Sequence, residues 1–205
     1  MKKFRKHTME VRGVHMDGKV DYVGGNPLWH EVYSCPSCHY SNHYLSFFQI
    51  NAGNRELIQK TLKKEQLPVI QSSNKKSPFD LLVQRYLQAI HLNEVIDPGK
   101  YIRIGTLWLN LYWLSRETED DRFAKYCAQR AVKKFRVVLD AGQVSDVADR
   151  GYAALALANL LEYLEMDQED IPEYCAIAAE CKEEKMQKCL KAFLAMLNGE
   201  EETEE

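Results

Sequence analysis

The sequence predicts a mainly α-helical protein, built of TPR-like (tetratricopeptide-like) antiparallel helical hairpins that follow a small β- and loop-rich cysteine-knuckle module. Three observations predict it. Helical periodicity runs from Ser77 to Leu197, a turn-rich N-terminal part holds the pair Cys35 and Cys38, and the polar stretch 71–77 separates the two. We therefore expect an N-terminal module (1–70), a helical domain (77–198) and an acidic tail (199–205).

The N-terminal module reads as short strands and turns. Residues 8–15 alternate weakly, the run Gly24-Gly25-Asn26-Pro27 indicates a turn, and residues 28–33 read as a strand that leads into Cys35. Residues 44–50 are aromatic and apolar and suit either a strand or a helix. Residues 54–66 suit a helix with Asn54 as its cap, ended by Pro68.

Five helices with short connections are expected after the linker. Ser77 and Pro78 open the first, Asp97 and Pro98 open the second, and Ser145 caps the fourth. The third is expected over residues 122–139, the fourth over 147–164 and the last over 169–197.

Short connections place consecutive helices antiparallel, which favours stacked hairpins. The third predicted helix carries small residues at a spacing of four and then three, at Ala124, Ala128 and Ala131. Small residues at this spacing let the second helix of a TPR-like hairpin close tightly on the first. The chain shows no clean 34-residue repeat, so the expected array is a divergent one.

Composition and charge limit the location and the partners. The chain has 205 residues, of which 45% are hydrophobic, and no apolar run that would span a bilayer. The N-terminus is basic but lacks the apolar stretch of an export signal, so we expect a cytoplasmic protein with reduced cysteines. Residues 1–77 hold 12 Lys and Arg against 6 Asp and Glu, whereas residues 78–205 hold 15 against 24.

The pair Cys35-Pro-Ser-Cys38 is the sharpest chemical signal. Two cysteines at this spacing can turn both sulfurs toward one zinc ion, which takes four ligands in a structural site. The remaining ligands would be nearby histidines, with His30, His39, His43 and also His15 as candidates, or residues of a segment that this sequence does not contain. The alternative is a pair of reduced structural thiols without metal.

Two other chemistries of the pair are less favoured. Residues 35–39 spell C-x-x-C-H, the haem c attachment string, but no export signal accompanies it. A thioredoxin-like redox pair would need a βαβ setting, which the sequence does not predict. The aromatic residues around the pair either stack on nucleic-acid bases or form the small core of the module: Trp29, Tyr33, Tyr40, Tyr44, Phe47 and Phe48.

Residues 26–40 resemble a bacterial family catalogued as domain of unknown function 2225. Its members carry an N-P-L-x-Y-x-x-x-x-C-P-x-C-G-Y block and then a helical, TPR-like region, in the order and length found here. His39 stands where members have glycine. Members typically carry another C-P-x-C knuckle upstream of the segment that begins here at Phe4, so the resemblance implies that Cys35 and Cys38 form half of a zinc-ribbon-like site.

We find no catalytic motif of the hydrolase, phosphate-binding or metalloprotease kind, so we expect no catalytic residue. The leading hypothesis is a non-catalytic adaptor with a structural zinc knuckle, whose helical hairpins offer a concave surface to a protein or peptide. The alternatives are a nucleic-acid-associated regulator that uses the basic residues Lys2, Lys3, Arg5 and Lys6, and a metal-dependent enzyme with an open zinc position.

Overall fold

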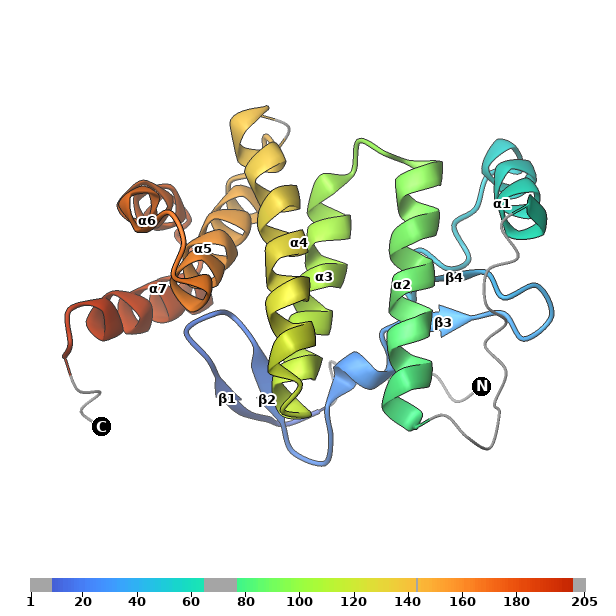
Figure 1. The fold of residues 1–205 in the computed structure, drawn as a ribbon. Coiled ribbons are helices and arrows are strands. Elements are labelled where there is room, and N and C mark those ends of the chain that lie inside the picture. The colour runs from blue at the N-terminus through green and yellow to red at the C-terminus, as the bar shows by residue number, and fades with distance from the viewer. Residues whose placement is uncertain (1–8, 65–76, 143, 201–205) are drawn as a thin grey trace.

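The structure is a computed structural model that describes residues 9–64, 77–142 and 144–200 (Figure 1). It confirms a mainly helical protein whose described strands all lie in the N-terminal part. The helices are α1 (Ala52–Lys64), α2 (Pro78–Ile96), α3 (Tyr101–Glu117), α4 (Asp121–Asp140), α5 (Val147–Leu164), α6 (Ile171–Ala179) and α7 (Glu184–Leu197). None of the described helices is long and apolar enough to cross a membrane.

Several predictions fall on parts that the structure does not describe. These are the end of the first helix near Gln66, the linker from residue 71 to residue 76, the basic residues at positions 2, 3, 5 and 6, and the acidic tail from residue 201 on.

The helix starts follow local hydrogen bonds. Ser77 caps α2 through a capping box, in which its hydroxyl accepts from the Asp80 N–H and the Asp80 carboxylate accepts from the Ser77 N–H. Asp120 caps α4 by accepting from the Phe123 N–H. The predicted cap of α5 was wrong by one residue, because Asp146, not Ser145, accepts from the Asp149 N–H.

The second predicted helix begins later than expected. Asp97 ends α2, where its N–H donates to the Asn93 carbonyl, and α3 begins only at Tyr101. The Asp97-Pro98 pair therefore lies in the turn between α2 and α3. Proline disfavours a helical conformation at the residue before it, which explains why α2 ends there.

The last predicted helix is broken in two. The chain leaves α6 at Ala179 and begins α7 at Glu184, with Glu183 in an extended conformation. At the break Cys181 lies against Gly151 of α5, where a Cβ atom on the glycine would stand 2.7 Å from the Cys181 Cβ. This close contact requires a glycine, and the break lets α7 turn back across α5 (Figure 1).

Two antiparallel strand pairs make up the described β-structure. Strands β1 (Val11–Val14) and β2 (Val20–Tyr22) form one pair, and β3 (Val32–Ser34) and β4 (Ser41–His43) form the other. The predicted strand over residues 28–33 is wrong in its first half. Asn26 accepts from the Leu28 N–H and starts a 3₁₀-helix, η2 (Pro27–His30), and only then does β3 begin.

Residues 44–50, which suited either a strand or a helix, form turns and contain neither element. The hydrogen bonds of this segment, from the Ser46 N–H to the His43 carbonyl and from the Gln49 N–H to the Ser46 carbonyl, are turn bonds. The aromatic residues of the segment therefore do not lie on a strand face.

One continuous apolar core runs through the helices and reaches into the N-terminal part. Ala124, Ala128 and Ala131 are fully buried on α4, in agreement with their predicted packing role. Gly105 of α3 leaves the space for the ring of Phe135, because a Cβ there would lie 2.9 Å from the ring. Leu28 and Val32 belong to the same core as the helices.

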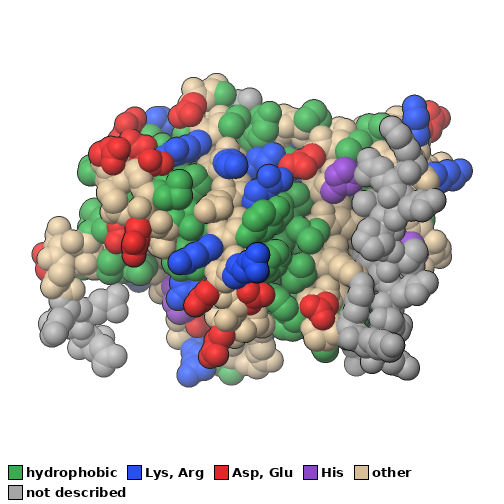
Figure 2. All heavy atoms as spheres, viewed as in Figure 1, with side chains coloured by type: hydrophobic (Ala, Val, Ile, Leu, Met, Phe, Trp, Pro, Cys, Tyr) green, Lys and Arg blue, Asp and Glu red, His purple; other side chains and the backbone are tan. Residues whose placement is uncertain are grey.

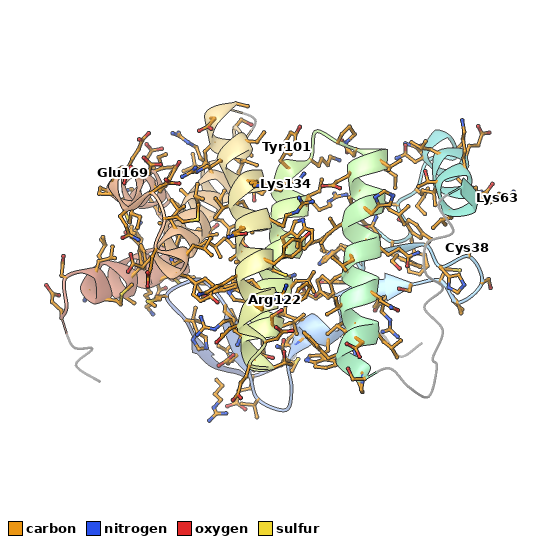
Figure 3. The ribbon with its side chains drawn as sticks, in the orientation of Figure 1. Cys38, Lys63, Tyr101, Arg122, Lys134 and Glu169 are labelled. Carbon is orange, nitrogen blue, oxygen red and sulfur yellow. The ribbon has the colours of Figure 1, made fainter. Side chains whose placement is uncertain are left out.

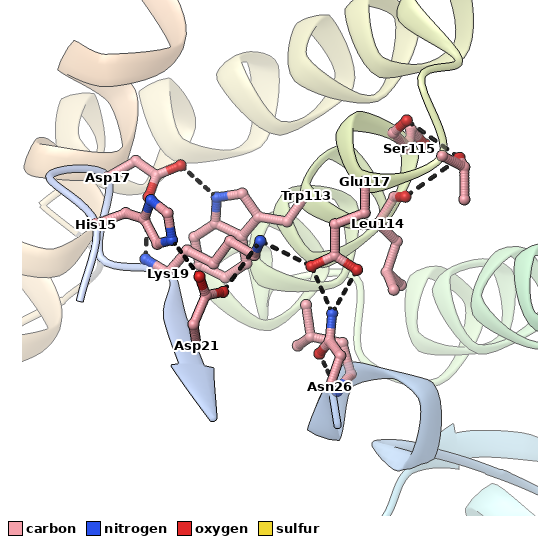
Figure 4. A network of polar contacts seen from close by, with 11 residues as sticks. His15, Asp17, Lys19, Asp21, Asn26, Trp113, Leu114, Ser115 and Glu117 are labelled. Carbon is pink, nitrogen blue, oxygen red and sulfur yellow. Dashed lines mark hydrogen bonds and ion pairs between the residues drawn. The ribbon is translucent and has the colours of Figure 1, made fainter. Parts of the chain in front are cut away.

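The β1–β2 hairpin lies on one face of the helices, formed by α3, α5 and α7. The carboxylate of Asp17, in the turn of the hairpin, accepts from the Trp113 indole N–H of α3 at 2.6 Å. The Met16 carbonyl accepts from the Asn159 amide of α5 at 3.5 Å. Glu117 at the end of α3 receives both the Lys19 ammonium, at 2.7 Å, and the Asn26 amide (Figure 4). The chain thus covers this face with its own N-terminal hairpin.

Candidate metal site and polar cavity

The predicted knuckle lies in the loop that joins β3 to β4. The Cys35 N–H donates to the Tyr40 carbonyl at 2.8 Å, and the His39 N–H donates to the Cys35 carbonyl at 2.9 Å. His39 has a φ of 60°, in the left-handed region that favours glycine. The backbone at His39 is therefore held in this conformation by the closure of the β3–β4 loop. Cys38 projects near the outer end of the molecule (Figure 3).

The loop favours the thiolate form of one cysteine. The backbone N–H groups of Cys38 and Ser37, together with the Cys38 thiol, donate toward the Cys35 sulfur and lower the pKa of Cys35. Desolvation raises the pKa of Cys38, although the Tyr40 N–H acts in the opposite direction. Two neighbouring sulfurs, each reached by backbone N–H groups, are chemically suited to supply half of a zinc site.

The structure does not bring a third ligand to the two sulfurs within the described residues, where no group of three His, Cys, Asp or Glu side chains is placed to hold a metal ion. His43 points elsewhere, with its Nε2 3.9 Å from the Glu31 carboxylate and its ring 4.6 Å from that of Tyr44. His30 ends η2 at an exposed position.

The aromatic residues of the module divide between two packing groups. Tyr40 is buried in a small cluster with Ile58 of α1 and Leu92 of α2, and Phe47 packs on it with ring centroids 5.1 Å apart. Trp29 instead packs on Phe79 of α2. Tyr40, Phe47 and Trp29 therefore pack on apolar cores, while Phe48 remains 79% exposed.

A cavity of about 370 Å³ adjoins the module, and sequence reasoning missed it. It lies between β2, η2, the turn after β4, and helices α3 and α5. Glu31 is buried at its wall, and one carboxylate oxygen accepts from the Asn110 amide of α3 at 3.0 Å. Thr106, Tyr152 and Lys185 contribute further polar groups to the lining.

One signal in the sequence pointed to this cavity. Glu31 is a charged residue between Leu28 and Val32, both of which are core residues. A carboxylate in such a place is buried, and a buried carboxylate requires polar partners. Its partner Asn110 lies 79 positions away in the chain, so the sequence alone did not reveal the site.

Comparison with known proteins gives one match. Searches of the curated proteins and of the solved structures found nothing similar. Residues 1–197 match the family described as an uncharacterised protein conserved in bacteria, DUF2225. The match covers nearly the whole chain, including the knuckle loop, the buried Glu31 and all the described helices. The chain therefore belongs to this bacterial family.

Proposed function

We propose that this protein is a non-catalytic interaction protein with a structural zinc knuckle, and that it binds its partner on the face between α2 and α4. The observation that carries the proposal is the position of the β1–β2 hairpin. The hairpin covers the face of α3, α5 and α7, which in TPR-like hairpins would be offered to a peptide. The opposite face, between α2 and α4, is therefore the surface that we assign to a partner.

The first part of the proposal is a structural zinc ion at the knuckle. Cys35 and Cys38 would supply two thiolate ligands, and the other two would come from outside the described residues. A zinc ion closed by four protein ligands stabilises a fold without offering an open position for substrate. It would fix the β3–β4 loop, which has only short strands to hold it.

Zinc analysis tests this part. Protein purified without added metal is expected to contain about one zinc ion per chain, and Cys35→Ser with Cys38→Ser is expected to remove it. Cys127→Ser is the matched control, because Cys127 is buried in α4 and lies outside the β3–β4 loop. Absence of zinc from the wild type, or full zinc content in the double variant, would contradict the proposal.

The α2–α4 face carries cations stacked on aromatic rings. Arg130 of α4 lies over the Trp108 ring of α3 at 5.4 Å, and Lys134 lies over the Tyr101 ring at 5.6 Å. Lys134 also bridges to Glu94 of α2 at 2.8 Å. Figure 2 shows this face, with Lys and Arg side chains beside hydrophobic ones, and Figure 3 labels Tyr101, Arg122 and Lys134 on it.

Several polar atoms on this face lack a hydrogen bond to any described residue. They include the buried Nε1 of Trp108 and the Nε of Arg130. A partner whose carboxylate drew the Arg130 side chain outward would reach the indole N–H of Trp108 as well. Cations on aromatic rings and unused N–H donors suit an acidic peptide segment.

Site-specific cross-linking in the native cell tests the assigned face. A photoreactive residue in place of Tyr126, which is 46% exposed beside Trp108, is expected to capture one protein. The same residue in place of Leu194 on α7, which is 40% exposed, is the matched control and should not capture it. Arg130→Glu in the Tyr126 variant is expected to abolish the adduct. An adduct that persists after Arg130→Glu, or that forms equally from position 194, would contradict the assignment.

A further inference from the structure

We propose that another cavity, between the start of α1, the end of α2 and the start of α3, binds a phosphate group. This α1 cavity has a volume of about 230 Å³. That is several times the volume of about 30 Å³ that one water molecule takes in the liquid, so a small oxyanion fits. The turn after β4 and the turn between α2 and α3 complete its wall, and it shares no lining residue with the cavity beside Glu31.

The α1 cavity has a polar lining with one positive charge in excess. Apart from three isoleucines, every residue of the lining carries a polar or charged side chain. The Lys100 ammonium lies 2.9 Å from the Asp97 carboxylate, so these two charges balance each other. Arg103 of α3 is the other charged residue of the lining, and it forms no ion pair or hydrogen bond within the described residues. An anion is therefore the ligand that the charges of the cavity favour.

A buried hydroxyl can donate to the same anion. Tyr40 is only 5% exposed, and its hydroxyl oxygen accepts from the Asn42 amide at 2.8 Å. The Asn42 amide oxygen accepts from Asn93 and from the His43 N–H, which fixes the orientation of the amide. The Tyr40 O–H proton thus has no acceptor in the part of the chain that the structure describes, and Tyr40 lines the cavity. A buried donor of this kind normally has a partner, either water or a ligand.

The charge of Arg103 acts at this hydroxyl. Burial raises the pKa of Tyr40, and the positive charge of Arg103 acts in the opposite direction, which shows that the guanidinium lies near the ring. Both groups line the same cavity from different elements, Tyr40 from the segment between β3 and β4 and Arg103 from α3. One anion can therefore accept hydrogen bonds from both.

The N-terminal end of α1 adds a favourable potential. Asn51 caps this helix, since its side-chain oxygen accepts from the Asn54 N–H at 2.7 Å and its carbonyl accepts from the Arg55 N–H at 3.1 Å. Asn51 and Asn54 both line the cavity. The N-terminal end of a helix carries a partial positive charge, and the first turn of α1 contains no acidic residue that would neutralise it.

A phosphate group uses these donors more fully than a carboxylate does. A guanidinium can donate two parallel hydrogen bonds to two oxygens of one phosphate. The remaining phosphate oxygens can then accept from the Tyr40 hydroxyl and from the asparagine amides of the lining. A carboxylate has only two oxygens, so binding it to Arg103 in the same way would leave the other donors without an acceptor.

Calorimetric titration of the full chain at constant ionic strength tests the ligand class. Inorganic phosphate or glycerol 3-phosphate is expected to bind with a Kd below about 1 mM, and acetate at least about tenfold more weakly. Tighter binding of glycerol 3-phosphate would identify the source as a small phosphorylated molecule, and tighter binding of inorganic phosphate would identify it as the free ion. Failure of both phosphate compounds to bind, or acetate binding of equal strength, would overturn the proposal.

A variant of Arg103 and a spectrum locate the binding. Arg103→Gln is expected to weaken the tighter phosphate compound by at least about tenfold. Arg122→Gln is the matched control, because Arg122 is exposed on α4 and does not line the cavity. In ¹⁵N NMR spectra of the wild type, the amide signals of residues 51–54 should shift with the ligand, while those of residues 124–131 stay in place.

The conservative variant keeps the test decisive. If Arg103→Gln does not fold by circular dichroism, Arg103→Lys takes its place, with an expected loss of at least about threefold, because an ammonium cannot form the two parallel hydrogen bonds. Wild-type affinity in the folded Arg103 variant, an equal loss in Arg122→Gln, or unshifted signals at residues 51–54 would show that phosphate does not bind in this cavity.

Discussion

The helical region and the N-terminal strand region bury different kinds of side chain. From α3 to α7 the buried residues are mostly apolar, whereas the β3–β4 region buries Glu31, Ser41 and Asn42. Each of these polar residues has a partner on a helix. Glu31 accepts from Asn110, the Ser41 hydroxyl donates to Gln88 at 2.9 Å, and the Asn42 amide oxygen accepts from Asn93 at 3.0 Å.

This difference indicates that one set of contacts stabilises the fold and another sets the position of the strand region. Apolar burial is non-directional and supplies most of the stabilisation, so the helices carry the stability of the fold. Hydrogen bonds between buried groups are directional and costly to leave unmade. They fix how the small strand region sits on α2 and α3, and the one from Asn110 to Glu31 lies at the wall of the cavity.

Thiol reactivity should separate the two regions most strongly. With metal chelated, iodoacetamide at about pH 8 is expected to modify Cys35 and Cys38 at least about a thousandfold faster than Cys127. Cys35 has a lowered pKa and the pair lies at the surface, whereas burial raises the pKa of Cys127 to about 12. Peptide mass spectrometry over time measures the rates. Similar rates for Cys35 and Cys127 would show that the helical core opens as readily as the loop.

A substitution in the helical core should show how much apolar burial contributes to the free energy of unfolding. Phe135→Ala is expected to lower the free energy of unfolding by about 3–5 kcal/mol, because Phe135 is fully buried and fills the space beside Gly105. Urea unfolding followed by circular dichroism measures it. Val137→Ala on the same helix, where the side chain is 38% exposed, should change it by less than about 1 kcal/mol. An equal loss of unfolding free energy in Phe135→Ala and Val137→Ala would argue against the burial of Phe135 in the core.

Replacing a buried polar residue by an apolar one should destabilise the strand region more than the helices. Asn93→Leu removes the donor to Asn42 and is expected to cost about 1–3 kcal/mol. Hydrogen exchange of residues 41–43 should become faster, while that of α4 stays as in the wild type. Gln129→Leu, at an exposed position of α4, is the control. Unchanged exchange in β4 would mean that this hydrogen bond does not place the strand.

The smallest effect is expected from one hydroxyl. Tyr86→Phe removes the donor to the Leu28 carbonyl at 2.7 Å and should cost about 1 kcal/mol near neutral pH. Burial raises the pKa of Tyr86 well above its usual value, so the folded tyrosine keeps its proton where the unfolded one loses it.

The stability of the wild type should therefore fall relative to Tyr86→Phe as the pH rises above about 10, the ordinary pKa of tyrosine. Urea unfolding at several pH values measures the difference. A difference that stays constant or grows with pH would contradict the described burial of Tyr86.

Local signals allowed much of the helical region to be predicted. Ser77 and Pro78 define a helix start by their own chemistry, and the alanines of α4 indicate close packing by their size. The break between α6 and α7 was missed because it depends on the contact of Cys181 with Gly151, thirty positions earlier. Periodicity continues across such a break and does not reveal it.

The site was predicted only in its local part. Cys35 and Cys38 are neighbours in sequence, so their proximity follows from their spacing. The cavity required Glu31 to meet Asn110 and Tyr152, and no spacing rule relates residues so far apart. Likewise, the sequence predicted a helical surface for a peptide, and nothing in it showed that the β1–β2 hairpin would cover the face formed by α3, α5 and α7.

The docked hairpin also has a consequence for the order in which the protein forms. The turn of the hairpin, at Met16 and Asp17, is synthesised early, yet Asn159 and Trp113 that receive it follow 143 and 96 positions later. Long loops must close before these bonds form, and a chain grows by only about 5–20 residues each second. On the ribosome the hairpin therefore remains undocked for several seconds, until α5 has emerged. Its docking is then a late step that completes the molecule.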